Sequence, residues 1–333
     1  MDPIRFGVIG FRQGWAHAST LSTMEGARLV AIAELSESAR QDAEQFGARF
    51  YTDHREMLAK ETLDAAVVCV PHYLLPDIGC ECLERGLHVL IEKPMAPDRA
   101  GADRMLAAAR QSGRRLAVGY QWRAHPATQK LKAMIDAGEL GTISLAHSFW
   151  VGYSPEEYFA MPWKGERARG GGPTLLVASH VVDTFRYLLG EVTEVRAQFN
   201  RLRGWEAEDG AAVSLRFAKG ALATLVYGTA ALQPPGGVRT FYLMGDRAAV
   251  SYPPLSKSWY PWSTPHSYYR EREQGIPPTT RDVPVGPAPT LLQNFCATIR
   301  GEAELLSSGE DARRTLEVLM EIIRHGDAPS DGA

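Results

Sequence analysis

A glycine turn near the start of the chain has the residue types that bind the phosphates of a dinucleotide. The run IRFGVIG (residues 4–10) ends in Gly10, and the next apolar run, ARLVAIAEL, carries Glu34 near its end. A strand, a glycine turn and a helix, with an acid about 20 residues later, form the usual dinucleotide-binding layout. The glycines let the backbone approach the pyrophosphate, which lies at the positive end of the helix.

The acid at Glu34 predicts which cofactor is used. A carboxylate at the end of the second strand accepts hydrogen bonds from the adenosine ribose and repels a 2′-phosphate. We therefore expect NAD, with NADP possible. Arg12 leaves that choice open, because it can either bond the pyrophosphate or reach the adenosine end.

The turn departs from the G-x-G-x-x-G pattern. Counted from Gly10, the second and third glycine positions hold Arg12 and Trp15, and a glycine stands at position 14 instead. One interpretation is a strand, turn and helix that no longer bind a dinucleotide. The other is a remodelled turn, whose expected cofactor contacts are Gly10, Phe11, Arg12, Gln13 and Gly14.

The elements that position this turn alternate between strands and helices. Apolar runs at residues 27–35, 63–71 and 88–94 are separated by helix-compatible stretches at about 15–24, 36–46, 77–85 and 99–112. Such alternation predicts right-handed βαβ units and a parallel sheet. We expect an α/β fold with an N-terminal Rossmann-type, doubly wound sheet over residues 1–122.

The second part of the chain has a different pattern. After a predicted helix at about 126–137, strands with two-residue alternation follow, among them VTEVRAQFN, AAVSLRFA and ALATLVYGT. This pattern is typical of an antiparallel sheet with one covered face. Residues 123–333 are expected to form an α+β domain with an open, mainly antiparallel sheet. The amphipathic C-terminal helix is a candidate to pack back on the first domain.

Composition excludes several classes of function. The 333 residues carry a formal charge of -3, which gives no basic field for nucleic acid or anionic membrane. No apolar run reaches the roughly 18 residues that span a bilayer, and the start of the chain lacks the features of a signal peptide. We expect a cytoplasmic protein with buried free thiols at Cys69, Cys80, Cys82 and Cys296, and no metal site.

An ordered set of motifs identifies a family resemblance. DAAVVCVPHYLLPDIGCECLERGLHVLIEKP (64–94), VGYQWRAHP (118–126), GELGTI (138–143) and GGGPTLLVASHVVDTFRYLLGE (170–191) resemble the Gfo/Idh/MocA oxidoreductases, as does the terminal SGEDARRTLEVLMEI. The resemblance covers nearly the whole chain. It implies an NAD(P)-dependent dehydrogenase or reductase that transfers hydride to or from a hydroxyl or keto carbon of a sugar, glycoside or cyclic polyol.

The resemblance implies that Lys93 of the EKP motif lies at the nicotinamide end of the cofactor, close to the substrate oxygen. An ammonium there donates to a carbonyl oxygen as hydride arrives and stabilises alkoxide in reverse. Lys93 is therefore expected to be catalytic and to contact both cofactor and substrate. Glu92 is expected to orient Lys93 or contact the nicotinamide ribose, and Pro71 and His72 match the turn over the adenosine side.

The resemblance also implies a catalytic His180, the base in the D-x-x-x-H helix of the family. Residues at i and i+4 share one helix face, so that both can reach one substrate. Here the Asp position is Leu176, and leucine cannot share a proton. His180 then acts alone, or Lys93 carries the proton transfer, or the substrate differs. Asp183 either orients the imidazole or supports the domain interface.

Further matches extend the expected site. Gln121 and Trp163 are expected at the cofactor, and Trp163 at the substrate with Arg123, His180 and Asp183. The resemblance implies a homodimer or homotetramer with a carbohydrate-like substrate. Two alternatives remain. One is redox-neutral glycoside cleavage by transient oxidation, elimination and re-reduction, and the other is a non-catalytic dinucleotide- or sugar-binding relative.

Overall fold

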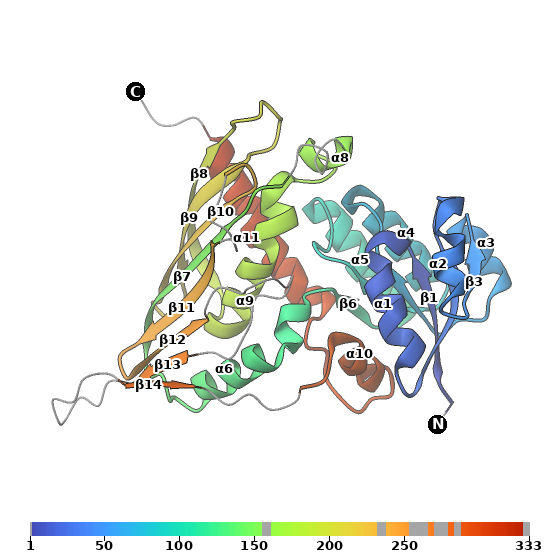
Figure 1. Cartoon of the computed structure of the whole chain (residues 1–333), viewed down its shortest axis with the longest axis horizontal. Helices are drawn as coiled ribbons and strands as arrows, with labels where there is room; N and C mark the ends of the chain where they lie inside the picture. Colours follow the sequence, from blue (N-terminus) through green and yellow to red (C-terminus); the bar gives the residue numbers. More distant parts are fainter. Residues whose placement is uncertain are drawn as a thin grey trace. The chain divides into compact units, whose positions relative to one another are not determined.

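The chain forms two compact units. One comprises residues 1–121 and 289–316, and the other residues 122–288 and 317–333, so that helix α11 (Gly309–Asp327) is divided between them. The structure is a computed structural model that describes residues 2–154, 161–231, 238–252, 266–269, 279–282 and 288–328 (Figure 1).

The first unit is built on a six-stranded parallel sheet with the strand order β3-β2-β1-β4-β5-β6. The order reverses next to β1, which makes the carboxyl ends of β1 and β4 the place where open α/β sheets bind ligands. The doubly wound parallel sheet is therefore confirmed. Its strands are β1 (Ile4–Ile9), β2 (Ala27–Ala33), β3 (Arg49–Tyr51), β4 (Ala65–Val68), β5 (His88–Ile91) and β6 (Leu116–Val118).

Helices connect these strands, as the alternating pattern predicts. Asp53 caps the helix His54–Lys60, because its side chain accepts a hydrogen bond from the Arg55 N–H. The stretch at 36–46 is less regular than expected and divides into η1 and α2. The helical segments are α1 (Phe11–Thr23), η1 (Glu37–Ala39), α2 (Arg40–Glu44), α3 (His54–Lys60), η2 (His72–Leu74), α4 (Leu75–Glu84) and α5 (Arg99–Ser112).

Residues 289–316 return to the first unit and cover one edge of its sheet. The Val118 N–H of β6 donates to the Ser307 carbonyl, and Ala117 pairs with Ser308. This segment contains α10 (Leu291–Ile299), which begins with a capping box between Thr290 and Gln293 and was not predicted. The pairing protects the exposed edge of β6 from other strands.

The second unit contains an eight-stranded sheet with the order β14-β13-β12-β11-β7-β10-β9-β8. Only β7 and β10 pair in parallel, so that the open, mainly antiparallel sheet is confirmed among the described strands. Strands β12 to β14 were not predicted. The strands are β7 (Ile143–Val151), β8 (Val192–Asn200), β9 (Gly210–Phe217), β10 (Leu222–Gly228), β11 (Val238–Gly245), β12 (Ala248–Tyr252), β13 (His266–Tyr269) and β14 (Thr279–Asp282).

One face of this sheet is covered by α9 (Ser179–Leu189), and Figure 1 shows the helix lying along it. Phe185 of α9 packs against Phe217 and Phe241, with ring centroids 6.5 and 4.9 Å apart. The other helical segments are η3 (Gln121–Ala124), α6 (Pro126–Asp136), α8 (Pro162–Gly165) and the π-helical turn η4 (Thr174–Ala178).

The described helices give no membrane span, since none of them combines the length and apolar character that crossing a bilayer requires. The four cysteines are buried and free, as expected.

Candidate functional site

The turn after β1 is shaped by Gly10. This residue has φ +84°, and a Cβ there would lie 2.5 Å from the Cys69 carbonyl oxygen. Glycine alone fits such a close approach of two backbones. Helix α1 begins directly afterwards at Phe11, four residues earlier than the predicted start near Trp15, so Arg12 and Gln13 lie in its first turn.

Gly14 replaces the third glycine of the usual pattern. A Cβ on Gly14 would lie 2.7 Å from Cγ1 of Val8, so glycine is needed for close packing of α1 on β1. Trp15, which stands at the nominal third position, is 51% exposed and packs edge-on against Phe46. The departure is therefore a shift of the packing glycine by one residue, and the close packing itself is retained.

Glu34 follows β2 and reaches the first turn of α1. Its Oε2 accepts a hydrogen bond of 2.8 Å from the Phe11 N–H, and its Oε1 accepts one of 3.3 Å from the Ser36 N–H. A carboxylate at a helix N-terminus is favoured by the helix dipole. Sequence reasoning assigned Glu34 to the ribose. The structure adds that the same carboxylate satisfies a backbone donor at the phosphate end of α1.

Pro71 and His72 follow β4. Pro71 precedes the short helix η2, and His72 opens it with a side chain that is 5% exposed. Both residues lie at the carboxyl end of a strand next to β1, on the same edge of the sheet as Gly10. The adenosine side of a dinucleotide is expected on this edge.

Lys93 follows β5 beside an acid. Burial of its ammonium lowers the pKa of Lys93, and the charge of Glu92 opposes that shift. Burial alone would raise the pKa of Glu92, but the hydrogen bond with His17 and the nearby Lys93 outweigh it, and the Glu92 pKa lies below its usual value. The site therefore pairs a stable carboxylate with an ammonium that releases its proton more readily than a solvated lysine.

Glu92 links three parts of the first unit. Its Oε1 lies 2.9 Å from Nε2 of His17 on α1, and its Oε2 accepts a hydrogen bond of 3.2 Å from the Lys93 N–H. A Cβ on Gly119 would lie 3.2 Å from the Glu92 carboxyl group, so a side chain there would press against that carboxyl group. Sequence reasoning missed His17. His17 shares a face of α1 with Gly14, but its partner Glu92 is 75 positions away, so the spacing of residues did not indicate the contact.

Gln121 supplies an acceptor at the end of β6. Its Oε1 is buried, and no hydrogen-bond donor reaches it from the residues that the structure describes. Buried acceptors without a partner are rare and call for an explanation such as a ligand. Together with the tight approach at Gly10 and the exposed start of α1, this atom gives the first unit the features that a bound dinucleotide requires.

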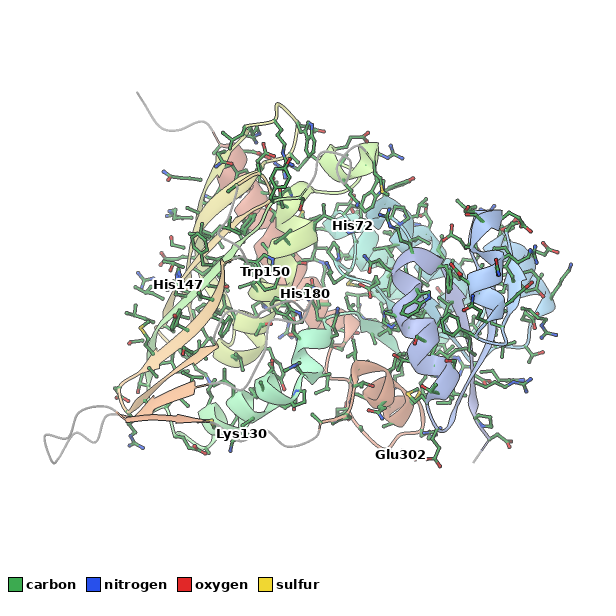
Figure 2. All side chains as sticks on the ribbon, in the orientation of Figure 1. His72, Lys130, His147, Trp150, His180 and Glu302 are labelled. Carbon is green, nitrogen blue, oxygen red and sulfur yellow. The ribbon has the colours of Figure 1, made fainter. Side chains whose placement is uncertain are left out.

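His180 lies on α9 in the second unit, within an aromatic cluster. Its ring stacks on Trp122 with centroids 4.7 Å apart and planes 14° apart, and Trp122 in turn contacts Trp150 at 5.0 Å. Figure 2 labels Trp150 and His180. The two tryptophans were not predicted as site residues, because their partners are distant in the sequence. The stacking holds the imidazole in a defined plane.

Arg123 and Asp183 form a buried pair in the same unit. Arg123 Nε and Nη2 donate to Asp183 Oδ2 and Oδ1 at 2.8 and 2.6 Å, and the two side chains are 4% and 1% exposed. The guanidinium also lies over the ring of Tyr187. Both residues were expected to bind substrate. The structure brings them together as partners of each other, which favours a positioning role that holds η3 against the middle of α9.

The segment before His180 is not a regular α-helix. Residues 174–178 form a π-helical turn, so Leu176 and His180 do not have the plain i and i+4 relation that sequence reasoning assumed. The turn is anchored by Glu208, whose Oε1 accepts from the Thr174 N–H at 2.6 Å, while Arg167 donates to its Oε2 at 2.6 Å. Single π turns of this kind frequently occur at functional sites.

Comparison with known proteins assigns the chain to a family. Residues 4–120 match the family described as "Oxidoreductase family, NAD-binding Rossmann fold", and residues 128–251 match the "GFO/IDH/MocA C-terminal domain". A myo-inositol 2-dehydrogenase from Thermotoga maritima is 31% identical over 236 residues, which is 67% of each chain. The chain belongs to the Gfo/Idh/MocA oxidoreductase family.

Two further relatives are described with nucleotide-linked sugars, one in its name and one as a bound molecule. The dTDP-3,4-didehydro-2,6-dideoxy-alpha-D-glucose 3-reductase of Actinomadura kijaniata is 29% identical over 234 residues, covering 68% of this chain and 69% of the relative. The WlbA dehydrogenase of Bordetella pertussis, solved with NADH and UDP-GlcNAcA, is 28% identical with a TM-score of 0.82. That match covers 99% of this chain and 100% of the WlbA chain. The first unit is accordingly an NAD-binding Rossmann domain.

Within the Gfo/Idh/MocA C-terminal domain, Trp163 and Lys164 lie on α8. Lys164 is 5% exposed, and its Nζ lies 5.7 Å from the centre of the Trp163 ring. Trp163 was expected at cofactor and substrate, and its role there stays a prediction. Lys164 adds a further buried cation, which stands beside the predicted Trp163.

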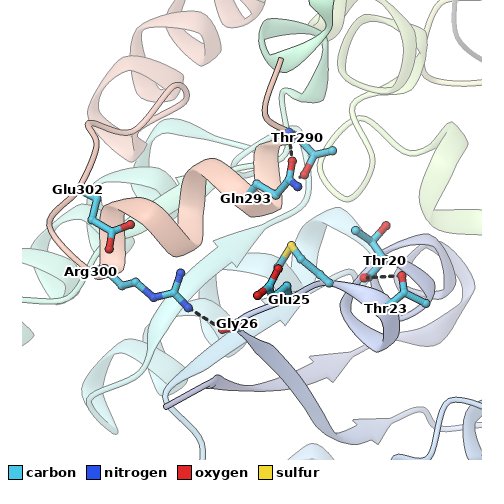
Figure 3. A pocket seen from close by; sticks show the side chains of 9 residues that line it. Thr20, Thr23, Glu25, Gly26, Thr290, Gln293, Arg300 and Glu302 are labelled. Atoms are coloured by element: carbon cyan, nitrogen blue, oxygen red, sulfur yellow. Dashed lines mark hydrogen bonds between the residues drawn. The ribbon is translucent and has the colours of Figure 1, made fainter. Parts of the chain in front are cut away.

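A hollow of about 660 Å³ lies elsewhere in this oxidoreductase's first unit, between the end of α1 and α10 (Figure 3). Thr20, Thr23, Gln293 and Arg300 are among its lining residues, and Arg300 donates to the Gly26 carbonyl. Helix α1 rises about 1.5 Å per residue, so its final turn is remote from Gly10. The hollow is not part of the dinucleotide site.

Proposed function

We propose that this protein catalyses reversible hydride transfer between NAD and a hydroxyl or keto carbon of a sugar, glycoside or cyclic polyol. The observation that carries the proposal is Lys93. Lys93 follows β5 at the edge of the sheet where the carboxyl ends of the strands lie. Burial lowers the pKa of its ammonium group. A proton donor whose pKa approaches the working pH is the more effective acid and base.

Residues of this chain position the substrate oxygen and transfer its proton. NAD, when bound, accepts or returns the hydride. Lys93 holds or donates a proton at the substrate oxygen and stabilises negative charge there, while Glu92 fixes the backbone at Lys93. His180 receives the hydroxyl proton in the oxidative direction, its ring held in plane by Trp122. Leu176 provides no second proton acceptor, so we assign the proton transfer to His180 and Lys93 alone.

The cofactor proposal extends to the adenosine end. Glu34 favours NAD, because a carboxylate at the first turn of α1 repels a 2′-phosphate. Pro71, His72 and Gln121 complete the proposed contacts on the first unit, and Trp163 those on the second.

The descriptions of two relatives add nucleotide-linked sugars to the substrate panel. One is a reductase of a dTDP-linked sugar, and the other was solved with UDP-GlcNAcA. We therefore include dTDP- and UDP-linked sugars with free sugars, glycosides and inositols.

The experiment starts with cofactor binding. The purified protein is checked for carried-over cofactor by absorbance and mass spectrometry, then titrated with NAD and NADP in a calorimeter. We expect NAD to bind more tightly, and Glu34→Gln to reduce that preference. Substrates are then screened for NADH formation at 340 nm. If neither dinucleotide binds and none is carried over, the proposal is wrong and a non-catalytic sugar-binding relative is the remaining interpretation.

A second candidate function is favoured by Leu176. An enzyme that oxidises a glycoside with NAD, eliminates the aglycone, adds water and then re-reduces the sugar with the resulting NADH cleaves its substrate without net redox change. The π-helical turn around Leu176, and the leucine in place of the family's Asp, are the features that favour this chemistry over simple dehydrogenation. Aglycone release from a glycoside panel without NADH accumulation supports this candidate, and stoichiometric NADH supports the dehydrogenase.

We also propose that the protein is a homodimer or homotetramer. Leu222, Leu145 and Met244 face one another across β10, β7 and β11 and are 42%, 48% and 37% exposed. An apolar row across three strands favours burial against a second copy. Light scattering of the wild type and of Leu145→Arg tests this, with an oligomer expected for the first and a smaller species for the second.

A further inference from the structure

Three side chains with different ligating atoms converge beneath the turn after β1. They are His17 on α1, Cys69 after β4 and Glu92 after β5. One nitrogen, one sulfur and one oxygen atom from them all lie within 4.8 Å of one another. The three residues are far apart in the sequence, so no spacing pattern announced them. They meet because β1, β4 and β5 are neighbours with their carboxyl ends on one edge of the sheet.

The donor set matches the chemistry of zinc. Zn²⁺ binds Cys sulfur, His nitrogen and carboxylate oxygen, and sites with three protein ligands leave a fourth position for water. With bonds of about 2.0–2.3 Å, the ligand atoms of a tetrahedral site lie about 3.3–3.6 Å apart. Nε2 of His17 and Oε1 of Glu92 are 2.9 Å apart, and all three ligand atoms lie within 4.8 Å of one another, so side-chain shifts on the order of 1 Å bring them to tetrahedral spacing.

Charge and access also favour a divalent cation. A thiolate and a carboxylate together neutralise Zn²⁺, and a neutral complex avoids most of the penalty for burying charge. The side chains of His17 and Glu92 are 17% and 16% exposed, which leaves an entry path, while Cys69 is buried. The thiolate selects a thiophilic metal over Mg²⁺ and Ca²⁺, which prefer oxygen ligands.

We propose that His17, Cys69 and Glu92 form a binding site for Zn²⁺ or a similar thiophilic divalent cation. Such a cation takes the Glu92 carboxylate away from its hydrogen bonds with His17 and the Lys93 backbone. It therefore places positive charge beside Lys93 and inhibits the enzyme. The inhibition rests on the proposed function, whereas the binding does not.

Cadmium titration tests the binding directly. Cd²⁺ is added to the full chain, and the thiolate-to-cadmium charge-transfer band is followed in the ultraviolet. We expect one equivalent to bind with a band that Cys69→Ser abolishes. His17→Gln should weaken binding by more than the roughly 10–100-fold that loss of an outer partner costs a metal site. Mg²⁺ should neither bind nor compete.

Cys80→Ser is the matched control, because Cys80 is also buried and free but lies on α4. It should bind cadmium like the wild type. A thermal melt of each variant separates loss of the site from loss of the fold, and His17→Gln remains informative if Cys69→Ser does not fold. No band in the wild type, a band retained in Cys69→Ser, or unchanged affinity in His17→Gln overturns the proposal.

The functional arm uses Zn²⁺ and NAD together. Zn²⁺ should inhibit turnover of the wild type and of Cys80→Ser, and chelation should restore it, while Cys69→Ser should resist inhibition at least tenfold better. Cadmium binding without any NAD binding leaves the metal site standing and sinks the proposed function. NAD binding and turnover without a cadmium band leave the proposed function standing and contradict the metal site.

Discussion

The first turn of the Rossmann unit and the first turn of the His180 helix both depart from their family patterns, but in different ways. In the Rossmann unit the departure is one of position: Gly14 performs the close packing expected one residue later. In the second unit the departure is one of chemistry: Leu176 stands where a carboxylate is expected, and a π turn surrounds it. Backbone roles can move by one residue and persist. A proton acceptor that is replaced by a hydrocarbon is lost.

The largest effect is expected in the Rossmann unit, where the proposed catalytic residue Lys93 matches the family pattern. Lys93→Met removes the proton donor at the substrate oxygen, and we expect kcat to fall about 10²–10⁴-fold, the usual contribution of a positioned acid or base. Burial lowers the pKa of Lys93, so the folded state binds its proton less readily than the unfolded chain. The sign of this linkage means that the charged ammonium destabilises the fold at neutral pH.

Lys93→Met should therefore melt at the same or a higher temperature than the wild type, as differential scanning calorimetry can measure. Lys219→Met is the control, since Lys219 is an exposed turn residue. A variant that keeps its activity, or that loses activity only because it unfolds, contradicts the proposed role of Lys93.

Variants of the Arg123–Asp183 pair test whether these two residues bind substrate or only stabilise the second unit. Asp183→Asn leaves a buried guanidinium without its counter-charge, and breaking such a pair costs about 3–5 kcal/mol of unfolding free energy. Urea denaturation measures this loss. The double variant Arg123→Met/Asp183→Leu removes both charges and should recover much of the stability. If Asp183→Asn is as stable as the wild type but has a raised KM, the pair binds substrate directly.

Sequence reasoning succeeded where patterns are local. The alternating apolar runs predicted the parallel sheet, and two-residue alternation predicted β7 to β11. It failed where partners are distant. His17 meets Glu92 across 75 positions, and Arg123 meets Asp183 across 60, so neither contact leaves a spacing signal. The helix start at Phe11 was missed because G-x-G-x-x-G was counted rigidly, and β12 to β14 because Pro and Gly interrupt their region.

Glycine substitutions break the Rossmann turn at its two tight points. Gly10→Ala places a Cβ against the Cys69 carbonyl at φ +84° and should cost about 2–3 kcal/mol, with NAD affinity falling at least tenfold. Gly14→Ala places a Cβ against Cγ1 of the buried, β-branched Val8 and should cost about 1–3 kcal/mol by overpacking. Thermal melts and NAD calorimetry measure both.

Gly47→Ala is the matched control, because Gly47 has φ +72° but open space around it. It carries the strain of the backbone conformation without the clash. If Gly10→Ala behaves like Gly47→Ala in NAD binding, the turn does not approach the cofactor.

His88, in the sequence GLHV (86–89), is a histidine with a structural role, in contrast to the proposed base His180. Its Nδ1 accepts the Arg115 N–H at 3.1 Å. Burial, Arg114 and Arg115 lower the pKa of His88 to about 4. Between pH 6.5 and 4, His88 is protonated in the unfolded chain but neutral in the folded state. The free energy of unfolding therefore falls as pH decreases through this window.

His88→Gln removes that titration. The difference in unfolding free energy between wild type and variant should therefore change by about 1–2 kcal/mol across the window, after allowance for solvent screening. Denaturant titrations at several pH values measure it. A pH-independent difference would mean that His88 titrates normally.

The smallest effect is expected where the second unit lacks its acid. Leu176→Asp restores the residue type but not the regular helix, because the π turn anchored by Glu208 shifts the 176 side chain relative to His180. We expect kcat to change less than tenfold and the pH profile to keep its shape, since a new proton relay with His180 would add a titration. Leu176→Asn has the same size without the charge and serves as the control. A rise well beyond tenfold for Asp and not for Asn would mean that the position can still serve as a proton partner, and the two departures would then be alike.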